Sequence, residues 1–154
     1  MLNADRRVLA VENFPLDGQI EHPFHQFQVM VAGRGRQTLV AEAGMDQLLV
    51  AYDELDLPPG TARLKLGGGH GGHNGMRDIF RHTVSQDFMR LRIGIGHPGH
   101  KSAVTGYVLS RPTADQERSI LESIDHAANV LPRVLDGDLP GAMKELHTEK
   151  NNGL

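Results

Sequence analysis

The run Leu48-Leu49-Val50-Ala51-Tyr52 constrains the fold more than any other part of the sequence. It is apolar or aromatic throughout and short, so we interpret Gln47–Tyr52 as a strand that is covered on both faces. Strands of this kind occur in largely parallel sheets that lie between helices. Further strand-like runs are Arg7–Val11, Phe27–Ala32, Ala62–Leu66, Phe88–Ile95 and Thr105–Leu109. The sequence thus predicts an α/β fold with a mixed, mostly parallel sheet flanked by helices.

The run Phe88–Ile95 alternates in character. Met89, Leu91 and Ile93 share one side, whereas Arg90 and Arg92 share the other. Successive side chains of a strand point to opposite faces. The alternation therefore predicts one apolar face and one face that carries two arginines.

The clearest helix pattern begins at Thr113, where Thr113-x-x-Gln116 forms a capping box. Apolar residues then recur at spacings of three and four, which lays one apolar stripe against the sheet. Pro132 is expected to kink or shorten this helix, and Asp136-Gly137 to end it. A second helix is expected from Leu139. Weaker helix patterns cover Arg34–Ala43 and Gly75–Thr83.

The chain has 154 residues, of which 39% are apolar, and this suits one domain over residues 1–154. It contains no cysteine, which excludes disulfides and thiolate chemistry. No apolar run is long enough to span a bilayer, and the first residues lack a signal peptide pattern. We expect a cytoplasmic protein without membrane contact.

Charge is distributed unevenly along the chain. The formal net charge is −3, which taken alone argues against nucleic-acid binding. However, residues 61–112 hold 8 Lys and Arg against 2 Asp and Glu, together with five of the nine histidines. The acidic residues concentrate on either side of this block. The average charge therefore hides a basic segment that suits an anionic partner.

Residues 67–75 read Gly-Gly-Gly-His-Gly-Gly-His-Asn-Gly, between a predicted strand and a predicted helix. Glycines allow positive φ angles and close approach of the backbone to a ligand, and a helix start favours anions. The pattern is neither a dinucleotide fingerprint nor a Walker loop. The alternative interpretation is a flexible loop with incidental polar residues.

Two histidine pairs share one spacing, His70-x-x-His73 and His97-x-x-His100. Neutral imidazoles bind zinc, but a competent site usually needs three or four ligands on a fixed backbone. We therefore predict no metal, with a metal site kept as an alternative.

Asp53 directly follows the predicted buried strand. Ligand sites of α/β sheets form at the carboxyl ends of strands, and a shielded carboxylate there can hold and polarise a histidine. Asp53 can equally bond the backbone of the following turn.

Three segments together resemble the bacterial peptidyl-tRNA hydrolase family. They are Val50–Gly60, with Tyr52-Asp53-Glu54-Leu55-Asp56-Leu57-Pro58-Pro59-Gly60; Lys65–Gly75, with the glycine and histidine motif; and Arg90–Gly99, with Gly94-Ile95-Gly96-His97-Pro98-Gly99. The resemblance covers about residues 47–147. It implies a monomeric α/β enzyme that cleaves the ester between a peptide and the 3′ ribose of tRNA, without metal or cofactor.

The resemblance also implies roles for individual residues. Asp53 matches the carboxylate that positions the general-base histidine, and Asn74 matches an amide that contacts the substrate's 3′ end. Residues that match the tRNA-contacting and substrate-binding positions are Lys65, Arg92, Lys101, Gly69 and His73, and Arg63 lies on the same strand face as Lys65.

The sequence departs from the family at its beginning. The family opens with a strand ending in Gly-Asn-Pro-Gly, followed by a Thr-Arg-His-Asn segment that supplies the general base, and residues 1–32 contain neither. Asn13, Pro15 and His22 roughly repeat the order Asn, Pro, His, which makes His22 the candidate base and His25 a weaker one.

Two further functions stay open. The first is a catalytically impaired relative that binds the tRNA acceptor end through Lys65, Arg92 and Lys101 without hydrolysis. The second is a metal- or nucleotide-binding domain that uses the glycine loop and the histidine pairs.

Overall fold

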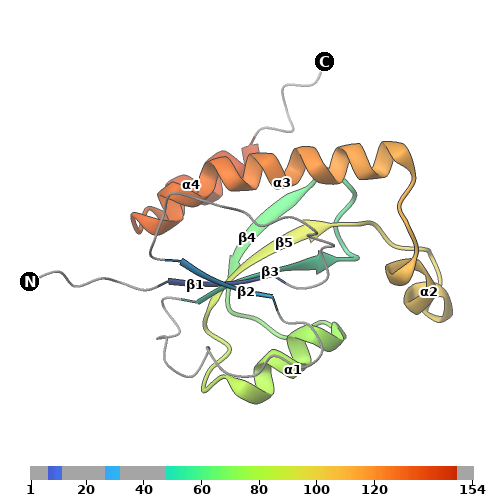
Figure 1. The fold of residues 1–154 in the computed structure, drawn as a ribbon, viewed down its shortest axis with the longest axis horizontal. Helices are drawn as coiled ribbons and strands as arrows, with labels where there is room; N and C mark the ends of the chain where they lie inside the picture. The colour runs from blue at the N-terminus through green and yellow to red at the C-terminus, as the bar shows by residue number, and fades with distance from the viewer. Residues whose placement is uncertain (1–6, 12–26, 32–47, 149–154) are drawn as a thin grey trace, which may run out of the picture. The chain divides into compact units, whose positions relative to one another are not determined.

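The computed structural model describes residues 7–11, 27–31 and 48–148, the first two ranges as backbone only. The predicted helix Arg34–Ala43 and the candidate bases His22 and His25 lie outside these residues. Figure 1 shows the elements in their chain order. They are β1 (Arg7–Val11), β2 (Phe27–Val31), β3 (Leu48–Glu54), β4 (Ala62–Leu66), α1 (Asn74–His82), β5 (Met89–Gly94), the 3-10 turn η2 (Lys101–Ala103), α2 (Val104–Leu109), α3 (Ala114–Leu135) and α4 (Leu139–Thr148).

The strands form one five-stranded sheet in the order β2-β1-β3-β5-β4. β1 runs parallel to both of its neighbours, with Val8 opposite Gln28 on β2 and opposite Leu48 on β3. At the other edge, β4 and β5 run antiparallel, because the Gly67 amide bonds Phe88 O (3.0 Å) and the Gly94 amide bonds Thr61 O (2.8 Å). The predicted mixed sheet flanked by helices is confirmed.

Two compact units can be distinguished along the chain. The first comprises Met1–Tyr52 and Lys65–Arg90, and the second comprises Asp53–Leu64 and Leu91–Leu154. Their boundaries fall inside β3, β4 and β5, so each of these strands contributes residues to both units. We describe each unit by itself.

The core of the first unit lies between β3 and α1. Six buried residues form it, namely Leu48, Val50, Tyr52, Met76, Ile79 and Phe88, with Phe80 packed against them. Every residue of β3 from Leu48 to Asp53 is buried, as expected for a strand covered on both faces. α1 buries Met76 and Ile79, which are three residues apart and thus lie on one side of the helix.

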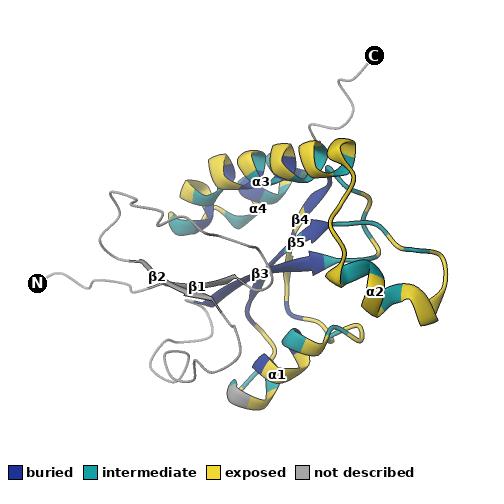
Figure 2. Cartoon of the chain, turned by 45° about the vertical axis from the view of Figure 1, so that its right-hand side comes forward, coloured by how far each residue is buried: buried dark blue, intermediate teal, exposed yellow. Residues whose placement is uncertain are grey.

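The second unit contains α3 and α4. α3 begins as predicted, because Thr113 and Gln116 form the capping box. It buries a stripe at spacings of three and four, consisting of Ser123, Ala127, Val130 and Val134. In Figure 2 the opposite side of α3 is exposed. Pro132 does not end the helix, which continues to Leu135.

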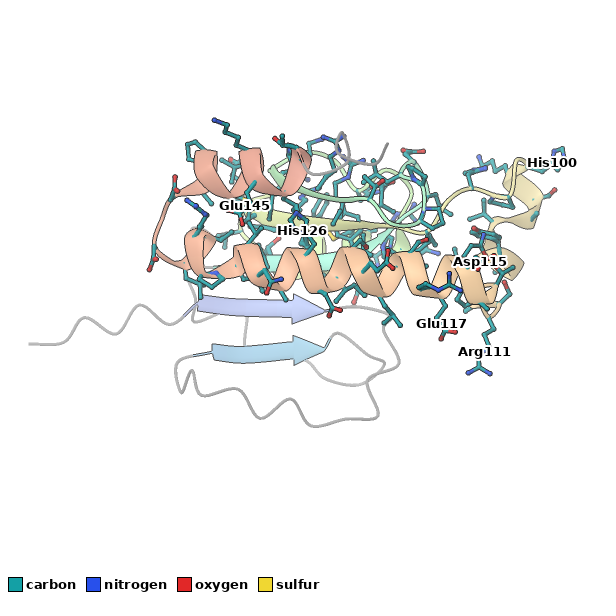
Figure 3. All side chains as sticks on the ribbon, turned by 90° about the horizontal axis from the view of Figure 1, so that it is seen from above. His100, Arg111, Asp115, Glu117, His126 and Glu145 are labelled. Atoms are coloured by element: carbon teal, nitrogen blue, oxygen red, sulfur yellow. The ribbon has the colours of Figure 1, made fainter. Side chains whose placement is uncertain are left out.

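Charged residues join the end of α3 to α4. Arg133 donates to Asp138 Oδ2 at 3.0 Å and to Glu145 Oε2 at 2.6 Å. The hydrogen bond to Asp138, followed by the negative charge of Glu145, raises the pKa of Arg133. Figure 3 shows Glu145 on α4.

The start of α3 carries acidic residues. Figure 3 also shows these residues, Asp115 and Glu117, in the first turn of α3. Carboxylates there complement the positive end of the helix dipole.

The prediction of a strand at Thr105–Leu109 is wrong, since Val104–Leu109 is the helix α2. Its partly buried residues are Val104, Tyr107 and Val108, which have helical and not alternating spacing. The Tyr107 hydroxyl donates to Ile95 O at 2.5 Å and so fixes one face of this short helix.

Candidate functional site

The glycine segment joins β4 to α1 in the first unit. Gly68 has a φ of +105°, and a Cβ built on it lies 3.0 Å from Lys65 Nζ. A side chain at this position would therefore be strained and would displace the ammonium group of Lys65. A Cβ on Gly69, by contrast, meets nothing within 4 Å. Of these two positions, Gly68 is thus the one at which the loop requires a glycine.

Arg90 binds the backbone of this loop. Its side chain is only 1% exposed, although Arg90 lies on the face of β5 opposite the apolar residues. Its Nη1 donates to Gly69 O at 2.6 Å, and its Nη2 donates to Gly68 O and to Gln86 O. The guanidinium carbon also lies 5.0 Å from the ring centroids of Phe80 and Phe88. The sequence alternation gave no sign that this arginine is buried.

His73 forms the start of α1. It is the N-cap residue, and its Nδ1 accepts a hydrogen bond from the Met76 amide at 3.1 Å. Its ring packs edge-to-face on Tyr52, with centroids 5.2 Å apart. Because Nδ1 is the acceptor, Nε2 is left as the protonated nitrogen. His73 therefore caps the helix on which Asn74 begins.

Asn74 is the first residue of α1 and is exposed. Its Oδ1 accepts a hydrogen bond from Arg77 Nη1 at 3.0 Å. This bond orients the amide group and leaves two N–H donors on its nitrogen to serve a ligand. The capped helix start therefore presents an oriented amide, and the contact of Asn74 with a substrate stays a prediction.

Asp53 belongs to the second unit and lies within β3, which extends to Glu54. It is 9% exposed, so its carboxylate is largely shielded from water. The sequence predicted that the acidic residues follow the strand, whereas in the structure Asp53 and Glu54 are the last two residues of β3. A shielded carboxylate can orient a neighbouring group, and this role of Asp53 stays a prediction.

Arg92 is already paired. Its Nε donates to Glu54 Oε2 at 2.9 Å, and the two side chains are 22% and 15% exposed. Glu54 Oε1 also accepts from the Asp56 amide at 3.1 Å. Of the predicted phosphate contacts, Arg92 thus has its charge compensated within the protein.

The other predicted basic contacts are exposed. Arg63 and Lys65 alternate with the buried Ala62 and Leu64 along β4, so they share one face as predicted. Lys101 is exposed at the start of η2. The first unit thus brings together Lys65, Gly69, His73 and Asn74, and the second unit holds Asp53, Arg63, Arg92 and Lys101.

The histidine pairs close turns. His70 Nδ1 accepts from the Gly72 amide at 3.0 Å, and His97 Nδ1 accepts from the Gly99 amide at 2.9 Å. Within residues 48–148, no group of three or more His, Asp and Glu side chains is arranged to hold a metal ion. In the same part of the chain, no helix is long and apolar enough to cross a membrane.

His147 on α4 makes a contact with β4 that the sequence did not reveal. Its Nε2 accepts a hydrogen bond from the Leu64 amide on β4 at 3.1 Å. Burial, and secondarily the positive charge of Arg63, lowers the pKa of His147. The neutral imidazole thereby ties α4 to the strand that carries Arg63.

Comparisons with known proteins agree on one family. The model of the family described as peptidyl-tRNA hydrolase matches residues 34–153. The peptidyl-tRNA hydrolase of Pseudomonas aeruginosa is 46% identical over 159 residues, covering 97% of this chain and 79% of its own. That of Azotobacter vinelandii is 43% identical with the same coverage. The similarity therefore extends beyond the expected residues 47–147 into the first part of the chain.

Solved structures give the same result for the fold. The crystal structure of peptidyl-tRNA hydrolase from Acinetobacter baumannii matches with a TM-score of 0.64 and 47% sequence identity. The match covers 66% of this chain and 52% of the solved chain, so the matched part spans about half the length of that relative.

Proposed function

The chain belongs to the peptidyl-tRNA hydrolase family, and on that premise we propose that it hydrolyses the ester between a peptide and the 3′ ribose of tRNA. Water attacks the ester carbonyl carbon, a general base accepts the proton of the water, and the ribose 3′ oxygen leaves with a proton. The observation that carries the proposal is the oriented amide of Asn74 at the end of an anchored glycine loop.

Asn74 is proposed to act on the substrate. Two amide N–H donors are suited to an ester carbonyl oxygen, whose negative charge grows as water attacks. The bond from Arg77 holds the other end of the amide, which lowers the cost of orienting it. His73 supports this role because it caps the helix on which Asn74 begins. Gly69 supports it because a Cβ built there meets no atom within 4 Å, so a ligand can approach the loop backbone at this residue.

Asp53 is proposed to position the general base. A largely buried carboxylate that accepts a bond from an imidazole orients the ring and stabilises its protonated form. The candidate imidazole remains that of His22, as predicted from the sequence.

The tRNA phosphates are proposed to contact Lys65, Lys101 and Arg63. All three are exposed and lie in the basic segment 61–112. Arg92 contributes less, since Glu54 compensates its charge. We propose that the protein acts as a monomer in the cytoplasm, where peptidyl-tRNA is produced.

A release assay tests the proposal. Labelled peptidyl-tRNA is incubated with the wild-type chain, with Asn74→Ala and with a control, Asp125→Asn, which changes an exposed residue of α3. We expect release by the wild type and the control and strongly reduced release by Asn74→Ala. Wild-type protein that binds the tRNA acceptor end without releasing peptide would instead favour the impaired relative.

A further inference from the structure

We propose that Arg90 is a positioning residue for the reaction, because it fixes the glycine loop and through it both Asn74 and Lys65. The inference rests on the proposed function for its catalytic part. Its structural part concerns only contacts within the first unit, which comprises residues up to Tyr52 and Lys65–Arg90.

The guanidinium of Arg90 is bonded to the loop by its two terminal nitrogens. Nη1 bonds Gly69 O at 2.6 Å, and Nη2 bonds the neighbouring Gly68 O. A planar fork with fixed donor directions can bridge two consecutive carbonyls, whereas the ammonium of a lysine cannot reproduce both directions. The third bond, from Nη2 to Gln86 O at 3.2 Å, ties the same fork to the segment that precedes β5.

The burial of this charge is costly. Arg90 is 1% exposed, and in the described part of the chain its hydrogen bonds go to backbone carbonyls and none goes to a carboxylate. The negative faces of Phe80 and Phe88, both 5.0 Å away, supply part of the missing compensation. An apolar residue would fill such a place more cheaply. The arginine is therefore best explained by what it does to the loop.

The contacts continue from the fixed carbonyls to the helix start. His70 follows Gly69, its ring packs on Phe80, and its carbonyl accepts the His73 amide at 2.8 Å. His73 then caps α1 and so sets where Asn74 begins the helix. On the other side, Gly68 lies against the Lys65 side chain. Arg90 thus supports both ends of the loop.

The experiment replaces Arg90 by lysine, which keeps the charge and loses the fork. The matched control is Arg81→Lys on the surface of α1, where the arginine side chain is 71% exposed. Amide hydrogen exchange is followed at Gly72 and Met76, whose amides bond His70 and His73. We expect exchange at both to accelerate by about tenfold or more in Arg90→Lys, with α3 amides and the control unchanged.

Kinetics with peptidyl-tRNA supply the second measurement. A misplaced Asn74 should lower kcat by roughly 10- to 100-fold in Arg90→Lys, with a smaller change in KM. Combined with Asn74→Ala, the loss should be less than the product of the two single losses. If the wild type proves inactive, the proposed function fails, and hydrogen exchange still decides whether Arg90 holds the loop.

Three outcomes would overturn the inference. Unchanged loop exchange in Arg90→Lys is one, exchange that accelerates equally in α3 is another, and multiplicative kinetic losses are the third. If Arg90→Lys does not fold, Phe80→Leu replaces it, since Phe80 contacts both Arg90 and the His70 ring. Faster exchange at Gly72 in that variant supports the inference, and unchanged exchange overturns it.

Discussion

Arg92 and Glu54 form an ion pair with 2.9 Å between Nε and Oε2, in which both side chains are mostly buried. The two residues come from neighbouring strands of the sheet, β5 and β3. The sequence suggested Arg92 as a contact of tRNA phosphates, but the pair gives this arginine an internal partner. The basic residues of the family motif therefore differ in how freely their charge can serve a ligand.

This difference predicts unequal salt dependence. Lys65→Gln should reduce the slope of log affinity against log salt for tRNA by roughly 0.7–0.9, the contribution of one phosphate contact. Arg92→Gln should reduce the slope less and should lower the free energy of unfolding by about 1–3 kcal/mol, because Glu54 loses its partner. Equal slopes for the two variants, measured by binding titrations at several salt concentrations, would contradict this prediction.

Glu54→Gln provides the complementary variant. It removes the compensating charge and retains a side-chain oxygen near Arg92. Binding of tRNA should tighten, and its salt dependence should steepen, since the arginine charge becomes available. Weaker binding by folded Glu54→Gln would indicate that the pair itself is needed at the interface.

The buried carboxylate predicts a second loss of activity. Asp53→Asn keeps the shape of the side chain and removes its charge, so it should reduce kcat by about 10²-fold or more if Asp53 stabilises a protonated base. Asp125→Asn on the exposed side of α3 is the control. Single-turnover peptide release measures both, and wild-type rates in Asp53→Asn would refute the assigned role.

Two adjacent glycines make a matched pair for stability. Gly68→Ala places a Cβ at a φ of +105°, close to Lys65 Nζ, and should destabilise the fold by about 1–2 kcal/mol. Gly69→Ala meets no atom within 4 Å and has no positive φ, so its stability should stay near that of the wild type. Denaturant unfolding measures the difference, and equal stabilities would show that the loop tolerates a side chain at Gly68.

His147 predicts a pH dependence of stability. Burial and Arg63 lower its pKa below 6.5, so the unfolded chain takes up the proton first as the pH falls. Its contribution is therefore complete above about pH 6.5 and is lost as the pH falls from there through the folded pKa. Protonation of Nε2 also removes the acceptor of the Leu64 amide.

NMR titration of the His147 ring should give a pKa below that of an exposed histidine. His147→Gln retains an acceptor without titrating, so its stability should change less between pH 5 and pH 7 than that of the wild type. Parallel pH profiles for the two proteins would remove His147 as the cause.

Most of the framework could be predicted because its signals are local. The unbroken apolar run of β3 and the Thr113–Gln116 capping box depend on neighbours within a few residues. The strand predicted at Thr105–Leu109 is wrong because the segment is short and begins with β-branched residues, whereas the bond that holds the α2 helix goes to the distant Ile95.

The candidate site was predictable only in part. The motifs predict Asp53 and Asn74 as site residues, and the structure adds that Asp53 is buried and that Arg77 orients the Asn74 amide. The burial of Arg90 and the partner of Arg92 could not be foreseen, since both depend on residues 21 to 38 positions away. Alternation along a strand assigns a face but does not say what covers it.

The turn histidines have a consequence for how a ligand is held. In each of three rings, Nδ1 accepts a hydrogen bond from a backbone amide, which selects the tautomer that carries its hydrogen on Nε2. These rings are those of His70, His73 and His97. Rings held in this way are oriented before a ligand arrives, so a contact that they make needs little further ordering of the side chain.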